Sequence, residues 1–406
     1  MQRFLGVALV AVGCTGSSTG TSHQGLTAAV KAERYTLIRD TAAQMGVTNG
    51  SLLAGIAISE TNLAHCQSEA TYACQGPASS SCGGGPIIAG SADGPCAQMQ
   101  GGLGMFQFDA GTYTDTVNTY GPDILTIEGN SAQAVNFVIG KVIQDIPNTT
   151  DWLGAAAWMN GVPVVAGEPV MEQWASLLAC RYNGCCSTST TCKTRAMGYR
   201  DNAIAAYNEM GAAFWLTANR CAALPADGVI DQRSECYLAA GDPRYWRRES
   251  VLGYGGNLEW TVATNDSAPK NFAMWIVKAQ PGRYHVDVHV DGGMFGQSKQ
   301  AKYEIAHAGT TETITLDQSL GTGFVSLGDF EFAGSGDEHV LLGDNTGEAS
   351  STNTKLAFDA IRVQSTSAVQ PDDPAGCCQT STGGAGTAGF ATGVAVIALR
   401  RRRRIV

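Results

Sequence analysis

The hydrophobic pattern of this 406-residue chain changes its period once, and this change constrains the fold more than any other feature. Between residues 26 and 218 apolar residues recur at the three-and-four-residue spacing of helices, whereas after Pro225 they alternate with polar residues as strands do. The pattern therefore predicts a multidomain protein with a mostly α domain at 26–218 and an all-β sandwich domain at 227–364. The chain is long enough for both, at about 100–200 residues per domain.

The helical region contains six segments with clear helical spacing, and a stretch rich in Gly, Ser and Cys between Cys66 and Gln100 that predicts a loop. The expected helices are 28–45, 51–63, 132–146, 153–159, 171–181 and 199–210.

The second region contains seven short segments of strand type, punctuated by turn signals such as Pro281-Gly282. Short alternating strands at such spacing predict a β-sandwich. The expected strands are 272–277, 283–290, 302–305, 312–316, 324–327, 339–342 and 357–363.

Composition excludes two classes of protein. Hydrophobic residues make up 44% and charged residues 15%, against a usual charged share of about 25%, which excludes a disordered, solvated chain. The net charge is −10, although Arg400 to Arg404 alone contribute five positive charges, so a nucleic-acid partner is not expected. No pattern in the chain calls for a cofactor.

Both ends of the chain look like targeting segments. Residues 1–14 begin with Arg3, continue with an apolar run, and predict an export signal. The sequence Ala11-Val12-Gly13-Cys14 resembles the lipobox of bacterial lipoproteins, which implies lipidation of Cys14. The alternative is a plain secretory signal followed by an incidental cysteine.

The C-terminal end predicts a membrane anchor. A linker at 365–382 leads into a tail at 383–406, whose apolar part is about 17 residues long, the lower limit for crossing a bilayer. The arginines that follow favour the cytoplasmic side and so leave the folded part outside. Cys377 and Cys378, then a helix, then arginines resemble the sorting tag of myxobacterial surface proteins; an ordinary tail anchor is the alternative. We therefore expect an exported protein anchored at the cell envelope or outer surface.

Export determines how the cysteines are interpreted. Ten of the 13 cysteines lie outside the terminal segments, and an even number in an oxidising compartment predicts up to five disulfides. Zinc binding is the weaker interpretation, because no paired C-x2-C spacing occurs, and the sequence leaves the connectivity open. These cysteines are Cys66, Cys74, Cys82, Cys96, Cys180, Cys185, Cys186, Cys192, Cys221 and Cys236.

One carboxylate falls on the apolar side of an expected helix. With Leu52 at 0° and 100° per residue, Ile56 lies at about 40° and Glu60 at about 80°, inside the apolar arc. Burial disfavours the charged carboxylate and raises its pKa, which suits a general acid near neutral pH. The alternative is a structural glutamate that makes a buried hydrogen bond.

Three motifs in the helical region together resemble one enzyme family. Leu53–Asn62 resembles the catalytic helix of lysozyme-like lytic transglycosylases, Gly102–Phe108 resembles their Gly-Leu-Met-Gln segment, and Tyr182-Asn183-Gly184 resembles their Tyr-Asn-Gly motif. The motifs occur in the family's order, and the likeness covers roughly residues 26–215. Arg181 and Phe106 depart from the family pattern.

The resemblance implies a role for each matched residue. Glu60 would act as general acid and then base, Met105 and Gln107 would hold a sugar substituent, Tyr182 would position Glu60, and Asn183 would shape the cleft. No metal is implied. Trp158–Gly161 is a competing candidate for the Tyr-Asn motif.

The number of carboxylates separates two reactions. A glycosidase with two carboxylates needs them about 5–9.5 Å apart, and Asp109 is the nearest candidate in sequence. With one carboxylate, the substrate itself supplies the nucleophile. For peptidoglycan, the substrate that the resemblance implies, this nucleophile would be the C6 hydroxyl of muramic acid, and a 1,6-anhydro product would form. We favour this transglycosylase reaction over hydrolysis by water.

The second region resembles the golvesin or xanthan-lyase C-terminal type of β-sandwich, on segments such as Lys302–Gly309 and Leu356–Val363. This likeness implies a targeting module rather than a second catalyst. Four polar residues, His285, Asp287, His289 and Asp291, alternate with valines on one strand; a solvated strand face is the preferred interpretation and a metal site the alternative.

These expectations combine into one hypothesis. The chain is expected to cleave the β-1,4 bond between N-acetylmuramic acid and N-acetylglucosamine in peptidoglycan, its macromolecular partner. A lysozyme-type or chitinase-like hydrolase and an inactive envelope-binding protein remain as alternatives.

Overall fold

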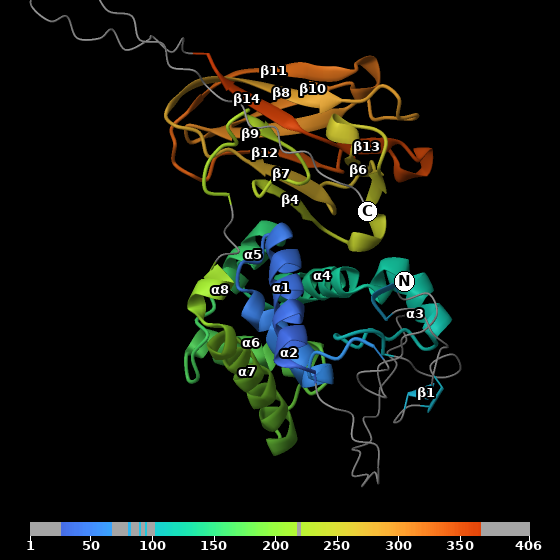
Figure 1. Cartoon of the computed structure of the whole chain (residues 1–406), viewed down its shortest axis with the longest axis vertical. Helices are drawn as coiled ribbons and strands as arrows, with labels where there is room; N and C mark the ends of the chain where they lie inside the picture. The colour runs from blue at the N-terminus through green and yellow to red at the C-terminus, as the bar shows by residue number, and fades with distance from the viewer. Residues whose placement is uncertain are drawn as a thin grey trace, which may run out of the picture. The chain divides into compact units, whose positions relative to one another are not determined.

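The computed structural model describes residues 26–66, 80–82, 89–90, 94–95, 102–216 and 221–366. Helices make up the first part and antiparallel strands the second (Figure 1), which confirms the predicted pairing of a mostly helical region with a β-sandwich. The expected export signal with Cys14, and the tail at 383–406, lie outside the described residues. Within the described ranges, no helix is both long and apolar enough to cross a membrane.

The helical region contains eight α-helices among its described residues. They are α1 (Ala28–Gln44), α2 (Gly50–Thr61), α3 (Tyr113–Tyr120), α4 (Ile127–Asp145), α5 (Trp152–Asn160), α6 (Pro169–Arg181), α7 (Thr190–Met210) and α8 (Ala212–Leu216). Short elements accompany them: the 3-10 turns η1 (Ser80–Cys82) and η2 (Pro122–Leu125), and the two-residue strands β1 (Ala89–Gly90) and β2 (Gly94–Pro95).

Four helices differ from the sequence expectation: α4 begins five residues earlier than predicted, α8 was not predicted, and the polar starts of α7 and α3 hid them. α7 begins at Thr190 instead of 199, with Ser189 as its N-cap accepting a hydrogen bond from the Cys192 amide. α3 was not predicted; five of its eight residues are Thr, Asp or Asn, and it begins at a capping box made by Thr112 and Asp115.

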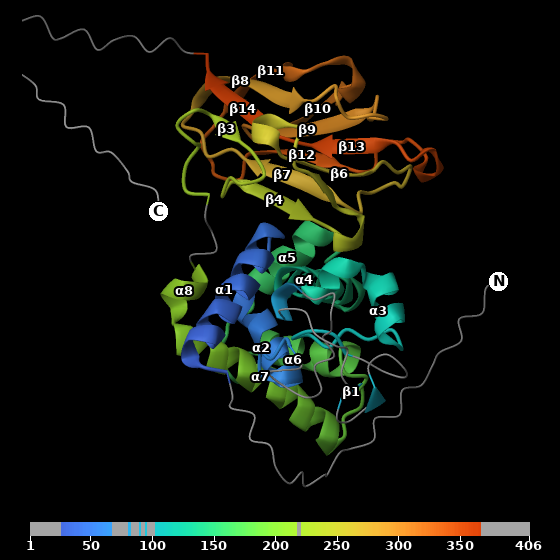
Figure 2. The ribbon, with the colours of Figure 1, turned by 45° about the vertical axis from the view of Figure 1, so that its right-hand side comes forward.

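Helix α2 lies in the centre of the helical region and packs against α1 and α7 (Figures 1 and 2). Every residue from Gly50 to Ala57 is buried. A Cβ atom on Gly55 would lie 2.6 Å from the backbone nitrogen of Ala203, so α7 approaches α2 at a distance that only glycine allows. This close crossing fixes which residues of α7 meet the C-terminal end of α2.

The second region is built from three antiparallel sheets. Figure 2 shows the strands of the five-stranded sheet in the order β10-β9-β12-β7-β4; the others have the orders β11-β8-β14-β3 and β13-β6-β5. Side chains of the two larger sheets share one core, which includes Trp275, Val288, Ile305 and Phe332. The strands are β3 (Val229–Ile230), β4 (Tyr237–Ala240), β5 (Arg247–Glu249), β6 (Leu258–Val262), β7 (Phe272–Ile276), β8 (Gly282–Val290), β9 (Ala301–His307), β10 (Thr310–Leu316), β11 (Gly323–Phe332), β12 (His339–Gly343), β13 (Lys355–Phe358) and β14 (Ile361–Ser365). The 3-10 turns of this region are η3 (Pro243–Tyr245), η4 (Tyr254–Gly256), η5 (Gln318–Leu320) and η6 (Ser350–Thr352).

The single strand expected at 357–363 is wrong. The segment is two strands in two different sheets, β13 beside β6 and β14 beside β8. Asp359 and Ala360 form the link between them, and the buried Asp359 carboxylate accepts hydrogen bonds from the amides of Tyr254 and Ala360. The apolar run continues through this break because both strands face the same core.

Four disulfides connect described cysteines: Cys66–Cys82, Cys180–Cys186, Cys185–Cys192 and Cys221–Cys236. Crosslinks at this density are typical of proteins that fold in an oxidising compartment, which supports export. Cys74 and Cys96 lie outside the described residues.

Candidate active site

Glu60 lies in the last turn of α2, where the buried helix reaches the edge of the core. Its side chain is partly buried, and this desolvation raises the pKa of the carboxyl above its usual value. The C-terminal end of a helix also carries partial negative charge, which disfavours a carboxylate there. The position therefore favours the protonated acid, as the helical periodicity predicted; a catalytic role for Glu60 stays a prediction.

The hydrogen-bond partner of Glu60 is Tyr199 on α7. The Tyr199 hydroxyl donates to Glu60 Oε1 at 2.5 Å, and the ring is almost fully buried. This bond stabilises the carboxylate and so lowers the pKa of Glu60, opposing part of the effect of burial. The sequence analysis missed Tyr199. Its one available signal was the small residue Ala203 one turn further along, which marks the helix face that meets Gly55.

Two more residues extend this contact. The Asn183 amide donates to the Tyr199 hydroxyl at 3.5 Å, and the Asn183 carbonyl oxygen accepts a hydrogen bond from the Arg195 guanidinium. The positive charge of Arg195 also lowers the pKa of Glu60. Asn183 is thus connected to Glu60 indirectly, because its hydrogen bonds go to Tyr199 and Arg195.

Tyr182 does not hydrogen-bond Glu60, contrary to the role that the resemblance implied. Its hydroxyl donates to the backbone carbonyl of Phe106, and its ring packs edge-on against Phe137 and Tyr199. The negative charge of Glu60 contributes to the raised pKa of Tyr182, after burial, so the two side chains are close. Tyr182 therefore binds the backbone of the turn that contains Phe106, while Tyr199 binds Glu60 itself.

The segment Gly102–Phe108 forms a tight turn beside the end of α2. Leu103 and Phe108 pair across the turn, and Thr61 donates to the Met105 carbonyl at 3.1 Å. The buried Asn130 amide of α4 fixes the turn by donating to the Leu103 carbonyl and accepting from the Phe106 amide. The turn is thereby attached directly to the helix that carries the acid.

The two residues predicted to hold a sugar have different exposures in this turn. The side chain of Met105 is fully buried in the core, so only its backbone lies at the turn. Gln107 is partly exposed and has a left-handed φ of 51°. Its amide nitrogen donates to the carbonyls of Gly102 and Gly104, which leaves its side-chain oxygen as the group without a partner in the described ranges.

Among the described residues, no hydrogen bond joins Asp109 to Glu60. Asp109 is exposed, and its carboxylate accepts a hydrogen bond from the Gly111 amide at 2.7 Å. Its negative charge raises the pKa of Tyr120 but does not contribute to the shift of Glu60. Glu60 is therefore the candidate acid of the site, and a role for Asp109 as second carboxylate stays a prediction.

The competing motif Trp158–Gly161 lies at the N-terminal end of α2, whereas Glu60 lies at the C-terminal end. Asn160 accepts hydrogen bonds from the amides of Thr48 and Asn49, immediately before α2 begins. At 1.5 Å per residue, the 12-residue helix separates this point from Glu60 by roughly 15 Å. The motif therefore serves to position the start of the helix.

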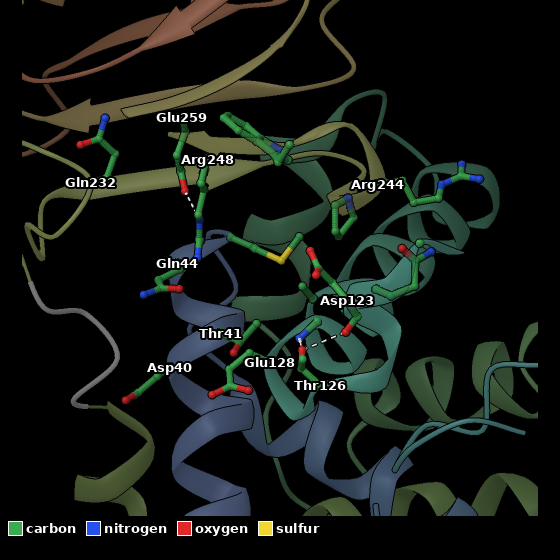
Figure 3. Close-up of a pocket in the computed structure, with 18 of the residues that line it drawn as sticks. Asp40, Thr41, Gln44, Asp123, Thr126, Glu128, Gln232, Arg244, Arg248 and Glu259 are labelled. Atoms are coloured by element: carbon green, nitrogen blue, oxygen red, sulfur yellow. Dashed lines mark hydrogen bonds and ion pairs between the residues drawn. The ribbon is translucent and has the colours of Figure 1, made fainter. Parts of the chain in front are cut away.

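A cavity of about 980 Å³ lies elsewhere and does not include Glu60, Gln107 or Tyr182 among its lining residues. Figure 3 shows its polar side chains, of which Arg248 donates to Glu259 at 2.8 Å and Thr126 donates to the Asp123 carbonyl at 2.8 Å. Among its labelled residues, the buried acid Glu259 is neutralised by that arginine. We place the candidate site at Glu60, a partly buried acid for which the described residues supply no such ion pair.

The polar residues of β8 are held by side chains of neighbouring strands and by each other, since His285 Nε2 lies 3.2 Å from Asp287 Oδ1. His285 pairs with Asp329, Asp287 with Arg362, and His289 with the buried Asp359. The valines are buried as the alternation predicted, but the solvated strand face is wrong: Asp287 is itself buried, and His289 is mostly buried against Asp359. In the described ranges, no group of three or more metal-ligating side chains converges, on this strand or elsewhere.

Comparison with known proteins identifies the second region. Residues 230–365 match the family model of the Golvesin C-terminal domain, in agreement with the resemblance seen in the sequence. Among solved structures, the chain is similar to a Paenibacillus xanthan lyase at 15% sequence identity and a TM-score of 0.29. That match covers 34% of this chain and only 13% of the lyase. The search of curated proteins returned no match.

Proposed function

We propose that the helical region cleaves the glycan strands of peptidoglycan at the β-1,4 bond between N-acetylmuramic acid and N-acetylglucosamine, as a lytic transglycosylase. The observation that carries this proposal is Glu60: an acid with a raised pKa at the end of a buried helix, held by the Tyr199 hydroxyl. The order of the three motifs around it supports the choice of substrate.

In this mechanism Glu60 first acts as general acid. Its proton passes to the glycosidic oxygen, the bond from that oxygen to C1 of the muramic acid breaks, and positive charge develops at C1. This step needs a protonated carboxyl, and burial of Glu60 raises its pKa in the direction that favours the proton.

Glu60 then acts as general base. The resulting carboxylate takes the proton of the muramic acid C6 hydroxyl, and the C6 oxygen attacks C1 to close a 1,6-anhydro ring. No water is consumed, so a second carboxylate to activate water is unnecessary. The Tyr199 hydroxyl stabilises the carboxylate form of Glu60 between the two steps.

The turn Gly102–Phe108 is proposed to bind the sugar next to the scissile bond. The free side-chain oxygen of Gln107 and the backbone of Met105 are the groups that it offers to an N-acetyl or hydroxyl group. Thr61 ties this turn to α2 and so fixes its distance from Glu60.

The rest of the chain is proposed to deliver this activity to the cell wall. The Golvesin-type sandwich acts as a targeting module, and Cys14 or the Arg-rich tail anchors the chain to a membrane from the outside. The disulfides support an exported location, and the net charge of −10 gives nucleic acid no role.

Turbidity loss of a suspension of purified peptidoglycan tests the proposal. The wild-type chain should clear the suspension, and Glu60→Gln should be slower by about 10²–10⁴-fold, because the amide has no proton to donate. Equal rates for the two chains contradict the proposal and favour an envelope-binding protein. Asp109→Asn is the matched control and should retain the wild-type rate, because Asp109 is exposed and bonded within its own turn.

A further inference from the structure

Residues outside the three motifs form a chain of contacts that ends at the candidate acid. Arg195 donates to the Asn183 carbonyl oxygen, the Asn183 amide donates to the Tyr199 hydroxyl, and that hydroxyl donates to Glu60 Oε1. Every donor in this sequence points toward the carboxylate. Such a polarised chain strengthens its last bond and favours the charged form of the group that accepts it.

The helix geometry explains why Arg195 and Tyr199 act together. They are four residues apart on α7, so they lie on the same side of the helix one turn from each other. The crossing at Gly55 and Ala203 directs that side toward the C-terminal end of α2. Asn202 also donates to Ser59 at 2.9 Å, which holds the two helices in this register.

Two disulfides hold Asn183 at its place in the chain of contacts. Asn183 lies inside the loop closed by Cys180–Cys186, and Cys185–Cys192 attaches that loop to the first turn of α7. The backbone adds hydrogen bonds from the Gly184 amide to the Cys180 carbonyl and from the Cys185 amide to the Ala179 carbonyl. A side chain in so constrained a loop keeps its distance from Tyr199.

We propose that Arg195 is a positioning residue that acts on Glu60 through Asn183 and Tyr199, and that it sets the pH at which the acid changes charge. The inference rests on Glu60 being the acid of the proposed function. Arg195 itself is exposed, and of its hydrogen bonds to described residues the one to Asn183 is the link that matters here.

The other titratable groups near Glu60 do not replace Arg195. Tyr182, after α6, lies at the site but donates its hydrogen bond to the Phe106 carbonyl. Tyr120 of α3 and Asp109 act on each other. Arg39 of α1 lies beside Gly50, at the opposite end of α2, and the α4 residue at the site, Asn130, is neutral. In the part of the chain that the structure describes, Arg195 is the charge that lowers the pKa of Glu60.

The test is a direct titration of Glu60 in the full chain without substrate. Carbon-13 NMR of chains labelled at the glutamate carboxyl carbon follows each glutamate, and Glu60→Gln identifies the resonance. In Arg195→Met the titration midpoint of Glu60 should move to higher pH, because the positive charge that stabilises its carboxylate is removed. Arg195→Lys retains the charge and should keep the midpoint closer to wild type than Arg195→Met does.

Two further variants complete the design. Asn183→Ala should move the midpoint in the same direction as Arg195→Met, because it breaks the link and leaves the arginine in place. Arg200→Met removes a charge from the same helix, but Arg200 is paired with Glu172 at 2.9 Å, so the Glu60 midpoint should not move. Circular dichroism checks that every variant is folded, and a wild-type midpoint in both folded Arg195→Met and folded Asn183→Ala overturns the inference.

This titration separates the inference from the proposed function. If Glu60 shifts as expected but wild-type chain does not cleave peptidoglycan, the contact chain stands and the proposed function fails. If wild type cleaves peptidoglycan but Glu60 titrates alike in all variants, the function stands and the role of Arg195 is wrong.

Discussion

At the scale of residues, opposing effects act on one carboxyl group. Burial raises the pKa of Glu60, while the Tyr199 hydroxyl and the Arg195 charge lower it. A general acid that later serves as base needs both, since each protonation state must be reachable during one turnover. The balance is set by two residues of α7, which lies more than 120 residues after α2 in the chain.

Tyr199→Phe is predicted to raise the pKa of Glu60, because it removes a hydrogen bond to the carboxylate. A general acid works while protonated, and activity falls as the pH rises through its pKa. The alkaline limb of the pH–rate profile should therefore move to higher pH, with a rate loss smaller than that of Glu60→Gln. The measurement is initial rate of peptidoglycan cleavage between about pH 4 and pH 9, a range that brackets ordinary and raised glutamate pKa values.

Tyr113→Phe is the matched control for this experiment. The Tyr113 hydroxyl is buried in the same region but has no hydrogen-bond partner among the described residues. Its removal should leave the profile in place. An unchanged alkaline limb in Tyr199→Phe would mean that the Tyr199 hydroxyl does not stabilise the carboxylate.

At the scale of elements, the site depends on how closely α2 and α7 approach. Gly55→Ala would place a Cβ atom 2.6 Å from the Ala203 backbone, so the helices must separate. We expect a loss of roughly 1–3 kcal/mol in the free energy of unfolding, the usual range for overpacking. Tyr199 would move away from Glu60 at the same time. Urea denaturation measures the first effect and the cleavage rate the second.

Gly140→Ala provides the comparison for Gly55→Ala. Gly140 is also inside a helix, α4, but a Cβ atom there would meet nothing within 4 Å. Alanine should stabilise the helix by roughly 0.5–1 kcal/mol, because it has the higher helix propensity. Equal stability changes for the two variants would contradict the close-approach argument.

The disulfide between the site loop and α7 is a second structural element of the site. The double variant Cys185→Ser with Cys192→Ser should lower the free energy of unfolding by about 2–3 kcal/mol, as expected for a short closed loop. It should also slow cleavage, because Asn183 is released. Removing Cys221–Cys236 should cost similar stability but leave the rate of the site unchanged; a matching loss of rate in both would show that stability alone explains it.

At the scale of the whole molecule, the sequence predicted those features that follow from local pattern. The change of period divided the chain into a helical and a strand region, and the periodicity of 51–63 put Glu60 against the core. The family of the sandwich was recognisable because its strands carry characteristic segments, and residues 230–365 match that family.

Features that depend on tertiary approach were not predictable from one sequence. Tyr199 meets Glu60 because two helices cross at Gly55, and the small residue Ala203 alone does not specify that crossing in a helix with several other alanines. The residues 357–363 read as one strand because the break at Asp359 carries no Gly or Pro. The pairing of Cys180 with Cys186, and of Cys185 with Cys192, is one of several combinations that four close cysteines allow.

A peptide map of the unreduced chain tests the disulfide pairing. Proteolysis followed by mass spectrometry should recover Cys66–Cys82 and Cys221–Cys236 as linked peptides, and should find Cys180 and Cys192 linked to different partners. A direct link between Cys180 and Cys192 would contradict the loop geometry that holds Asn183.

Mass spectrometry of the fragments released from purified peptidoglycan tests the central claim most directly. The account predicts muropeptides that end in 1,6-anhydromuramic acid from the wild-type chain and almost none from Glu60→Gln. Fragments with reducing muramic acid ends would instead show a hydrolase that activates water. The absence of any released fragment from folded wild-type chain would contradict a glycan-cleaving role for Glu60.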